Sequence, residues 1–417
     1  MIAGSTGSGK SEFIITYILS LALNYAPDDV AFVLIDYKGG GLSGAFKKKG
    51  AELPHLVGTI TNIDKAGLQR SLDSIQSELR RRQVMFNEAR NQINESTIDI
   101  YKYQKLYHEG IVKDPIPHLL IICDEFAELK QQQEDFIDEL ISVARIGRSL
   151  GVHLILATQK PSGVVNDQII SNSKFGICLK VQDKSDSMDV IKKPDAANLK
   201  RAGEFYINVG NDEYFTLGQS GWAGAPYVKS DTVQKKVDTS VDFISNIGNV
   251  VKKMEDYTEK RVETDTDQLT SIVRYLSDIA KEKNIQERQL WLDEIPANIY
   301  LDDLRNKYNV KSEKNVIVPI IGEYDNPYNQ QQGIYMLDLS NGGNTIVFGG
   351  AESGKETLIS TLIYDCMVSH TADEVNFYIL DLGSEIFKIF KPSPIVGDVV
   401  LSIEEEKIER LFGILKN

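Results

Sequence analysis

The chain has 417 residues, 42% hydrophobic and 25% charged, so it is long enough for two or three globular domains. A formal net charge of −14 argues against a surface built for nonspecific binding to nucleic-acid phosphates, although a local basic stripe is compatible with it. Cys123, Cys178 and Cys366 lie far apart in apolar runs and lack metal-ligand spacing, which indicates reduced, buried thiols in a cytosolic compartment.

A complete phosphate-binding loop (P-loop) opens the chain. It fills every position of the pattern G-x-x-x-x-G-K-[ST], and the expected nucleotide-binding residues are Gly4, Ser5, Thr6, Gly7, Ser8, Gly9, Lys10, Ser11 and Glu12. In such a loop the backbone N–H groups converge on nucleotide phosphates at a helix N-terminus. We expect Lys10 to neutralise the β- and γ-phosphates of ATP and the Ser11 hydroxyl to coordinate Mg²⁺.

The segment after this loop predicts a helix, and the segment before it indicates that opening strands are missing. The apolar run 13–23 is shorter than the ~20 residues that span a membrane, so we interpret it as the helix that a P-loop opens. A buried strand normally precedes a P-loop, but only residues 1–3 do so here, without a signal peptide. The module is therefore predicted to lack its opening strands and the chain to be a piece of a longer protein.

Apolar, strand-like runs alternate with helical stretches through the first 220 residues, which predicts an α/β fold with a largely parallel sheet and helices on both faces. Three of these runs end in polar residues, namely Asp36, Asp124-Glu125 and Thr158-Gln159. Ligands of such sheets gather beyond the carboxyl ends of the strands, so these residues are expected at the P-loop.

Asp124 and Glu125 are the strongest catalytic candidates after Lys10. Asp124 would hold Mg²⁺, directly or through water, and Glu125 would polarise the attacking water. Alternatively, both acids cap the following helix. Gln159 could contact the γ-phosphate or the lytic water.

Two groups of arginines have open roles. Arg80, Arg81 and Arg82 fall in a predicted helix over 65–87, where the simplest interpretation is a solvated face. Arg148, and less strongly Arg145, could serve as a finger that reaches a neighbouring subunit's nucleotide. The alternative is a local ion pair with the acids of segment 135–139.

A second, altered P-loop indicates tandem duplicated modules. Lys355 and Asp381 are as far apart as Lys10 and Asp36, and the second loop comprises Gly349, Gly350, Ala351, Glu352, Ser353, Gly354, Lys355, Glu356 and Thr357. Glu356 replaces the magnesium-binding hydroxyl and puts a carboxylate beside the triphosphate position, while Thr357 comes one residue late. We expect weak or static nucleotide binding and negligible hydrolysis by this module.

The predicted organisation is a first P-loop ATPase module over 1–230, a linker over 231–315 that contains a helix, and a truncated, degenerate second module over 316–417. Strand-like segments 316–321, 333–339 and 345–348 lead into the second loop. Trp291 lies in the connector, where it either packs ordinarily or plugs a surface pocket of the first module and restrains its ATPase activity.

These motifs together resemble the FtsK/SpoIIIE family of ring-forming P-loop motors, and within it the type VII secretion ATPases of the EssC/YukB type. The resemblance is carried by the first P-loop and by segments 34–41, 54–56, 59–62, 124–129 and 145–161. Segments 36–41, 182–187 and 220–227, with the tandem arrangement, resemble the secretion branch.

The resemblance implies a RecA-like P-loop NTPase fold and ATP hydrolysis in a hexameric ring. It also implies export of small WXG-type proteins together with other secretion-machinery components, by the cytoplasmic portion of a protein anchored in the bacterial cell membrane. The main alternative is a DNA translocase of the FtsK/SpoIIIE or conjugative type, whose ring would thread duplex DNA. A nucleotide-dependent scaffold without turnover is a third possibility.

Overall fold

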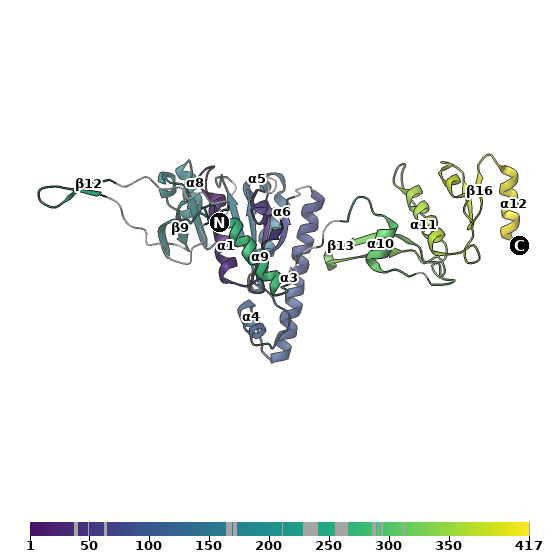
Figure 1. Ribbon diagram of the computed structural model, residues 1–417, viewed down its shortest axis with the longest axis horizontal. Coiled ribbons are helices and arrows are strands. Elements are labelled where there is room, and N and C mark those ends of the chain that lie inside the picture. Colours follow the sequence, from purple (N-terminus) through teal and green to yellow (C-terminus); the bar gives the residue numbers. More distant parts are fainter. Residues whose placement is uncertain are drawn as a thin grey trace. The chain divides into compact units, whose positions relative to one another are not determined.

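The computed structural model describes residues 1–36, 41–48, 50–61, 65–163, 169, 173–210, 212–227, 241–254, 266–285, 289–290, 292, 295–311 and 313–416. The chain divides into two compact units, Met1–Trp291 and Leu292–Asn417. Figure 1 shows the helices and strands of both units along the chain. No helix among the described residues is long and apolar enough to cross a membrane.

An eight-stranded sheet forms the centre of the first unit, in the order β10-β9-β8-β1-β7-β6-β2-β5. Its strands are β1 Ile2–Ala3, β2 Val30–Asp36, β5 Leu56–Ile60, β6 His118–Asp124, β7 Val152–Thr158, β8 Phe175–Leu179, β9 Glu204–Val209 and β10 Tyr214–Gln219. All neighbours from β5 through β8 are parallel, whereas β9 pairs antiparallel with both β8 and β10. The predicted, largely parallel sheet is confirmed, with the short β1 at its centre.

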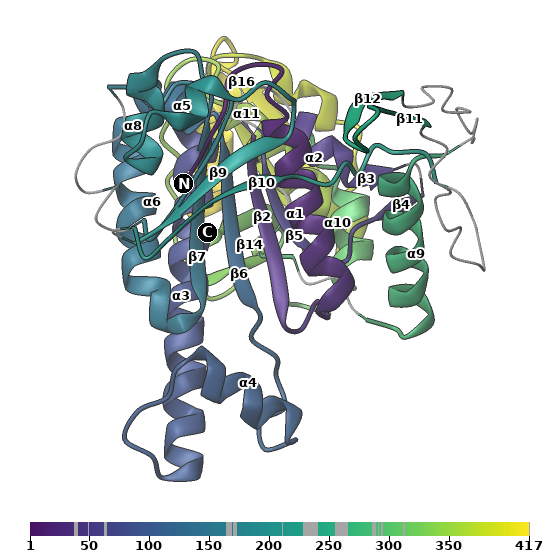
Figure 2. The ribbon, with the colours of Figure 1, turned by 90° about the vertical axis from the view of Figure 1, so that its left-hand side faces the viewer.

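Helices cover both faces of this sheet (Figure 2). Along β2, Ala31, Val33 and Ile35 pack in one buried cluster with residues of α3, α4 and α6, while Phe32 and Leu34 pack in another with α1 and α9. This alternation follows from the two-residue period of a strand. The helices of the first unit are α1 Lys10–Asn24, α2 Gly41–Ala45, α3 Lys65–Ile93, α4 Ile100–His108, α5 Phe126–Gln132, α6 Glu134–Gly147, α8 Lys184–Ile191 and α9 Gln268–Glu282.

Helix α9, which lies in the segment predicted as a linker, packs onto the first unit. Val273 is completely buried and Leu269 is 8% exposed, both in the cluster that also holds residues of α1. Leu290 is buried as well, and its backbone N–H donates to the Val57 carbonyl at 2.7 Å. The segment before α9 contains a hairpin of β11 Val241–Ile244 and β12 Val250–Met254. Another small hairpin joins β3 Lys47–Lys48 to β4 Ala51–Glu52.

The arginine run on α3 is not a uniformly solvated face, so that interpretation was wrong for its last member. Arg82 is 1% exposed, and its guanidinium donates to Glu78 Oε1 and to the Leu150 carbonyl, each at 2.8 Å. Arg81 also pairs with Glu78, at 2.7 Å. A charge run alone does not reveal which member points inward, because the orientation depends on how the helix packs.

The second unit repeats the start of the first. Its helices are α10 Leu301–Tyr308, α11 Lys355–Ser369 and α12 Glu405–Lys416, and its strands are β13 Ile320–Asn326, β14 Gln331–Met336, β15 Phe377–Asp381 and β16 Val396–Leu401. Helices α1 and α11 both have 15 residues and both follow a glycine of positive φ, 93° at Gly9 and 87° at Gly354. Strands β15 and β16 pair in parallel, as β2 and β5 do.

The strand expected at 345–348 is absent, and this expectation was wrong. These residues have no regular structure, and Ile346 and Phe348 are 74% and 88% exposed. In the first unit the corresponding strand β1 is held between β7 and β8. Within the described part of the second unit no strand pairs with 345–348, so its backbone lacks the ladder that would make it a strand.

Candidate nucleotide site

The first P-loop connects β1 to α1 and is anchored to the strands on either side of β1. The Gly4 N–H donates to the Thr158 carbonyl at 3.1 Å, and the Ser5 N–H donates to the Lys180 carbonyl at 2.9 Å. Helix α1 begins at Lys10, directly after the loop. The loop is thus fixed at the carboxyl ends of β7 and β8, where polar strand endings were expected to converge.

Two of the loop glycines are required by close contacts. A Cβ at Gly4 would lie 2.5 Å from Ser8 Oγ, and one at Gly9 would lie 2.8 Å from the Gly203 nitrogen. The Gly203 N–H donates to the Ser8 carbonyl at 2.8 Å, so the turn that enters β9 supports the P-loop from outside. Sequence reasoning missed this support, because no motif links Gly203 to a loop so distant in the chain.

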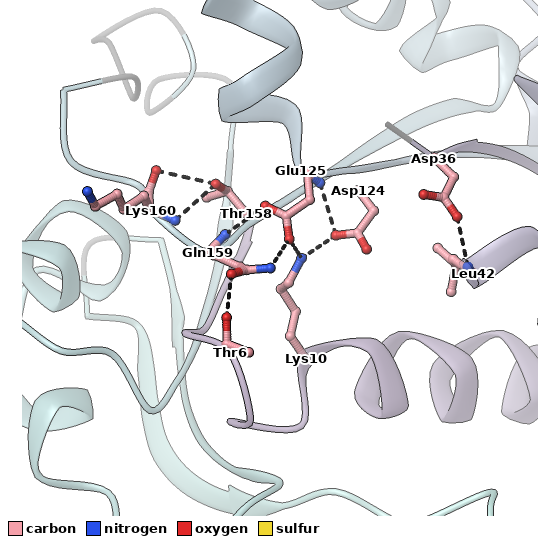
Figure 3. Close-up of polar contacts among 9 residues, drawn as sticks. All are labelled: Thr6, Lys10, Asp36, Leu42, Asp124, Glu125, Thr158, Gln159 and Lys160. Carbon is pink, nitrogen blue, oxygen red and sulfur yellow. Dashed lines mark hydrogen bonds and ion pairs between the residues drawn. The ribbon is translucent and has the colours of Figure 1, made fainter. Parts of the chain in front are cut away.

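Lys10 lies between the two predicted acids, as Figure 3 shows. Its Nζ donates to Asp124 Oδ1 and, at 2.9 Å, to Glu125 Oε1. All three residues are buried, at 5%, 8% and 3% exposure for Lys10, Asp124 and Glu125. The charge of the lysine offsets the repulsion between the neighbouring carboxylates, which burial would otherwise make costly.

Gln159 joins this group from the end of β7. Its Nε2 donates to Glu125 Oε1 at 2.6 Å, and its backbone N–H faces Glu125 Oε2 at 3.4 Å. Thr6 of the P-loop donates through Oγ1 to Gln159 Oε1 at 2.7 Å. The structure therefore brings together four of the expected catalytic residues and one loop residue (Figure 3). The role of Thr6 as a partner of Gln159 was not anticipated, because it depends on side-chain geometry.

Helix capping does not explain Glu125. This residue precedes α5 in the left-handed conformation, with φ of 55°, and its side chain makes no capping hydrogen bond. The Glu125 N–H donates to Asp124 Oδ1 at 3.0 Å, where β6 ends. The unusual φ directs the Glu125 carboxylate toward Lys10 and Gln159, a kind of backbone strain that clusters at functional sites.

The oxygen donors at the site fit Mg²⁺. Ser11 supplies a hydroxyl in the first turn of α1, and Asp124 supplies a carboxylate that already contacts the neighbouring Lys10. Magnesium is usually bound by one or two protein oxygens together with substrate phosphates and water. Among the described residues no larger cluster of metal-ligating side chains occurs, which is compatible with that arrangement.

Arg145 and Arg148 are not part of this group. Both are exposed, Arg145 in the last turn of α6 and Arg148 at its end, before the amino end of β7. The P-loop lies at the opposite, carboxyl end of β7. Neither arginine forms an ion pair with the described residues, so the local pair with segment 135–139 is not observed.

The second P-loop has a different lysine contact. Lys355 Nζ donates to the Gly350 carbonyl of its own loop, and Glu356 follows in the first turn of α11. Asp381 closes β15 as Asp36 closes β2, and each accepts a backbone N–H six residues later, Asp381 from Phe387 and Asp36 from Leu42. The duplication thus extends to hydrogen bonds. Trp291 lies outside the described residues.

A family comparison identifies the modules. The model of the FtsK/SpoIIIE family matches residues 1–163 and 309–416, and each matched segment contains one of the two P-loops. The chain belongs to the FtsK/SpoIIIE family. Its first unit therefore has the RecA-like P-loop NTPase fold.

The chain is also similar to two proteins of type VII secretion systems. It is 41% identical over its whole length to the type VII secretion system protein EssC of Staphylococcus aureus, of which it spans 28%. It is 40% identical to the ESX secretion system protein EccC of Geobacillus thermodenitrificans, of which it spans 27%. The chain thus corresponds to under a third of the length of these relatives.

A solved structure shares this fold over nearly the whole chain. It is the cytoplasmic domain of the type VII secretion ATPase EccC from Thermomonospora curvata, which is 27% identical, with a TM-score of 0.77. The match covers 98% of this FtsK/SpoIIIE-family chain and 44% of that chain.

Proposed function

We propose that the first module hydrolyses ATP and that this hydrolysis drives protein export by a type VII secretion system. The observation that carries the first part is the convergence of Lys10, Asp124, Glu125 and Gln159, which joins a P-loop lysine to a buried acid pair. A P-loop alone would only bind nucleotide. The second acid and its amide partner supply what turnover needs.

In the proposed reaction a water molecule attacks the γ-phosphorus of ATP, the bond to the ADP oxygen breaks, and the water gives its proton to Glu125. Hydrogen bonds from Lys10 and Gln159 stabilise the ionised Glu125 carboxylate, the form that accepts a proton. Lys10 would turn to the phosphates, whose charge competes with the acids for its ammonium group. Ser11 and Asp124 would hold Mg²⁺, which neutralises phosphate charge.

The secretion assignment rests on the similarity to EssC and EccC over the whole chain. By that similarity the cargo would be WXG-type proteins, and the motor would be a hexameric ring attached to the cell membrane through other parts of the protein. The modules would be 1–230 and 316–417, joined by 231–315, of which helix α9 packs onto the first unit. Arg148, or else Arg145, would act on a neighbouring subunit's nucleotide, because both lie far from their own P-loop and are exposed.

Substitution of Glu125 tests the reaction. Glu125→Gln keeps the size and the hydrogen-bonding shape but removes the base, so ATP hydrolysis should fall by about 10²-fold or more while ATP binding persists. Glu139 is an exposed acid on α6, so Glu139→Gln is the matched control and should retain wild-type turnover. Hydrolysis by Glu125→Gln at the control rate would show that Glu125 is not the base.

The cargo requires a separate experiment. Full-length protein that contains this chain should retain WXG-type proteins in a pull-down, and its ATPase rate should not respond to duplex DNA. The net charge of −14 makes strong DNA stimulation unfavourable. Stimulation by DNA without capture of WXG-type proteins would replace the secretion assignment with DNA translocation.

A further inference from the structure

One side-chain contact at the site has no role in the reaction described so far. Thr6 Oγ1 donates to Gln159 Oε1 at 2.7 Å, and Gln159 Nε2 donates to Glu125 Oε1 at 2.6 Å. The three side chains form one line of hydrogen bonds that starts in the P-loop and ends on the proposed base (Figure 3). They come from three separate strand ends or loops.

Chemistry fixes the direction of this line. An ionised carboxylate only accepts hydrogen bonds, so the Gln159 amide must present its nitrogen to Glu125. Its oxygen then faces Thr6, whose hydroxyl must donate. If Gln159 turned its amide by half a turn, the amide oxygen would face the carboxylate oxygen, and two acceptors would repel each other. The Glu125 carboxylate thus sets which way round the amide lies, and the hydrogen bond from Thr6 holds the Gln159 side chain in that place.

We propose that Thr6 is a positioning residue, which acts through Gln159 to orient the Glu125 carboxylate. The inference rests on the proposed ATP hydrolysis. Lys10 and Gln159 both donate to Glu125 Oε1, so the carboxylate is held from two sides. If ATP phosphates draw Lys10 away, the hydrogen bond from Gln159 to this oxygen stays in place, and the position of Gln159 then influences where the base points.

Thr6 is exposed at the loop surface, so direct contact with a phosphate is the competing role. The two roles differ in kinetics. Removing a residue that orients the base slows the chemical step and lowers kcat. Removing a residue that binds ATP equally before and during the reaction raises KM alone. One neutral hydrogen bond lost from the line corresponds to about a three- to tenfold fall in kcat.

The test compares Thr6→Val with Thr6→Ser in the full chain. Valine keeps the branched shape without the hydroxyl, so we expect kcat to fall about three- to tenfold with the Kd for ATP changed less than about twofold. Serine keeps the hydroxyl and should restore kcat to within about twofold of wild type. A raised Kd or KM with unchanged kcat in Thr6→Val would assign Thr6 to phosphate binding and overturn the proposal.

Adding Thr6→Val to a Gln159→Ala variant separates an effect through Gln159 from a local effect on the loop. In Gln159→Ala the line is already broken, so adding Thr6→Val should not lower kcat further. A full additional loss would show that Thr6 acts by another route. If the wild-type protein hydrolyses ATP and Thr6→Val has the same kcat, only the positioning role of Thr6 is refuted. If the wild-type ATPase rate does not exceed that of Lys10→Ala, the proposed function is refuted, and the positioning role with it.

Discussion

At the scale of single residues, the site consists of common motif residues joined by contacts that no motif describes. The convergence of Lys10 with the acid pair could be predicted, because P-loop spacing and strand-ending acids are local in sequence. The contact of Thr6 with Gln159 and the support from Gly203 could not. They join segments that only the folded sheet brings together.

A histidine pair at the other end of the sheet gives a prediction about pH. His118 Nδ1 and His153 Nε2 are 2.9 Å apart, so one ring must donate and the other accept. Burial, together with His153 and Arg82, lowers the pKa of His118 to about 4, against a weaker opposite effect of Asp29. Burial, Arg82 and Arg148 also lower the pKa of His153.

Because the unfolded His118 has its ordinary pKa of 6.5, the unfolded state binds the proton first as pH falls. The neutral pair therefore contributes stability above pH 6.5 that is lost as pH falls toward 4. We expect the melting temperature of wild type to fall more between pH 7 and 5 than that of His118→Gln. An equal fall in the two proteins would show that this pair does not titrate as described.

At the scale of elements, helix α9 shows what periodicity can and cannot predict. A helix was predicted within 231–315, and the structure forms it over Gln268–Glu282. Its packing onto the sheet beside α1 did not follow, because a polar stretch before it resembles a linker. An amphipathic helix identifies its buried face without identifying the surface that this face covers.

Substitutions on the two faces of α9 test its place in the first unit. Val273 is fully buried, so Val273→Ala should lower the free energy of unfolding of this unit by about 1–3 kcal/mol. Tyr275 is 62% exposed, and Tyr275→Ala should cost less than about 0.5 kcal/mol. Calorimetry of the full chain measures both free energies. The relevant unfolding transition is the one whose midpoint temperature rises when ATP binds. Equal shifts would place α9 outside the core of the first unit.

At the scale of the whole molecule, the duplication could be predicted from spacing alone, since Lys10 and Asp36 repeat as Lys355 and Asp381. The structure adds that the helix length, the glycine before the helix and the hydrogen bond of the closing aspartate also repeat. The absence of the strand expected at 345–348 shows the limit of prediction from the sequence. A strand depends on partners elsewhere in the sheet, so an apolar run does not determine it.

The two copies differ at the lysine. Lys10 contacts both acids of its module, whereas Lys355 contacts its own loop and is followed by Glu356 in place of a hydroxyl. A carboxylate at that position opposes the phosphate charge and removes a magnesium ligand. We therefore propose that the first module turns over ATP and that the second has a transmitting or regulatory role.

Paired lysine substitutions test this assignment most directly. ATP hydrolysis is measured in the full chain for wild type, Lys10→Ala and Lys355→Ala, with folding checked by circular dichroism. We expect Lys10→Ala to abolish turnover, a loss of about 10²-fold or more, and Lys355→Ala to keep most of it. Equal losses in the two variants, or a larger loss in Lys355→Ala, would contradict the claim that the first module hydrolyses the ATP.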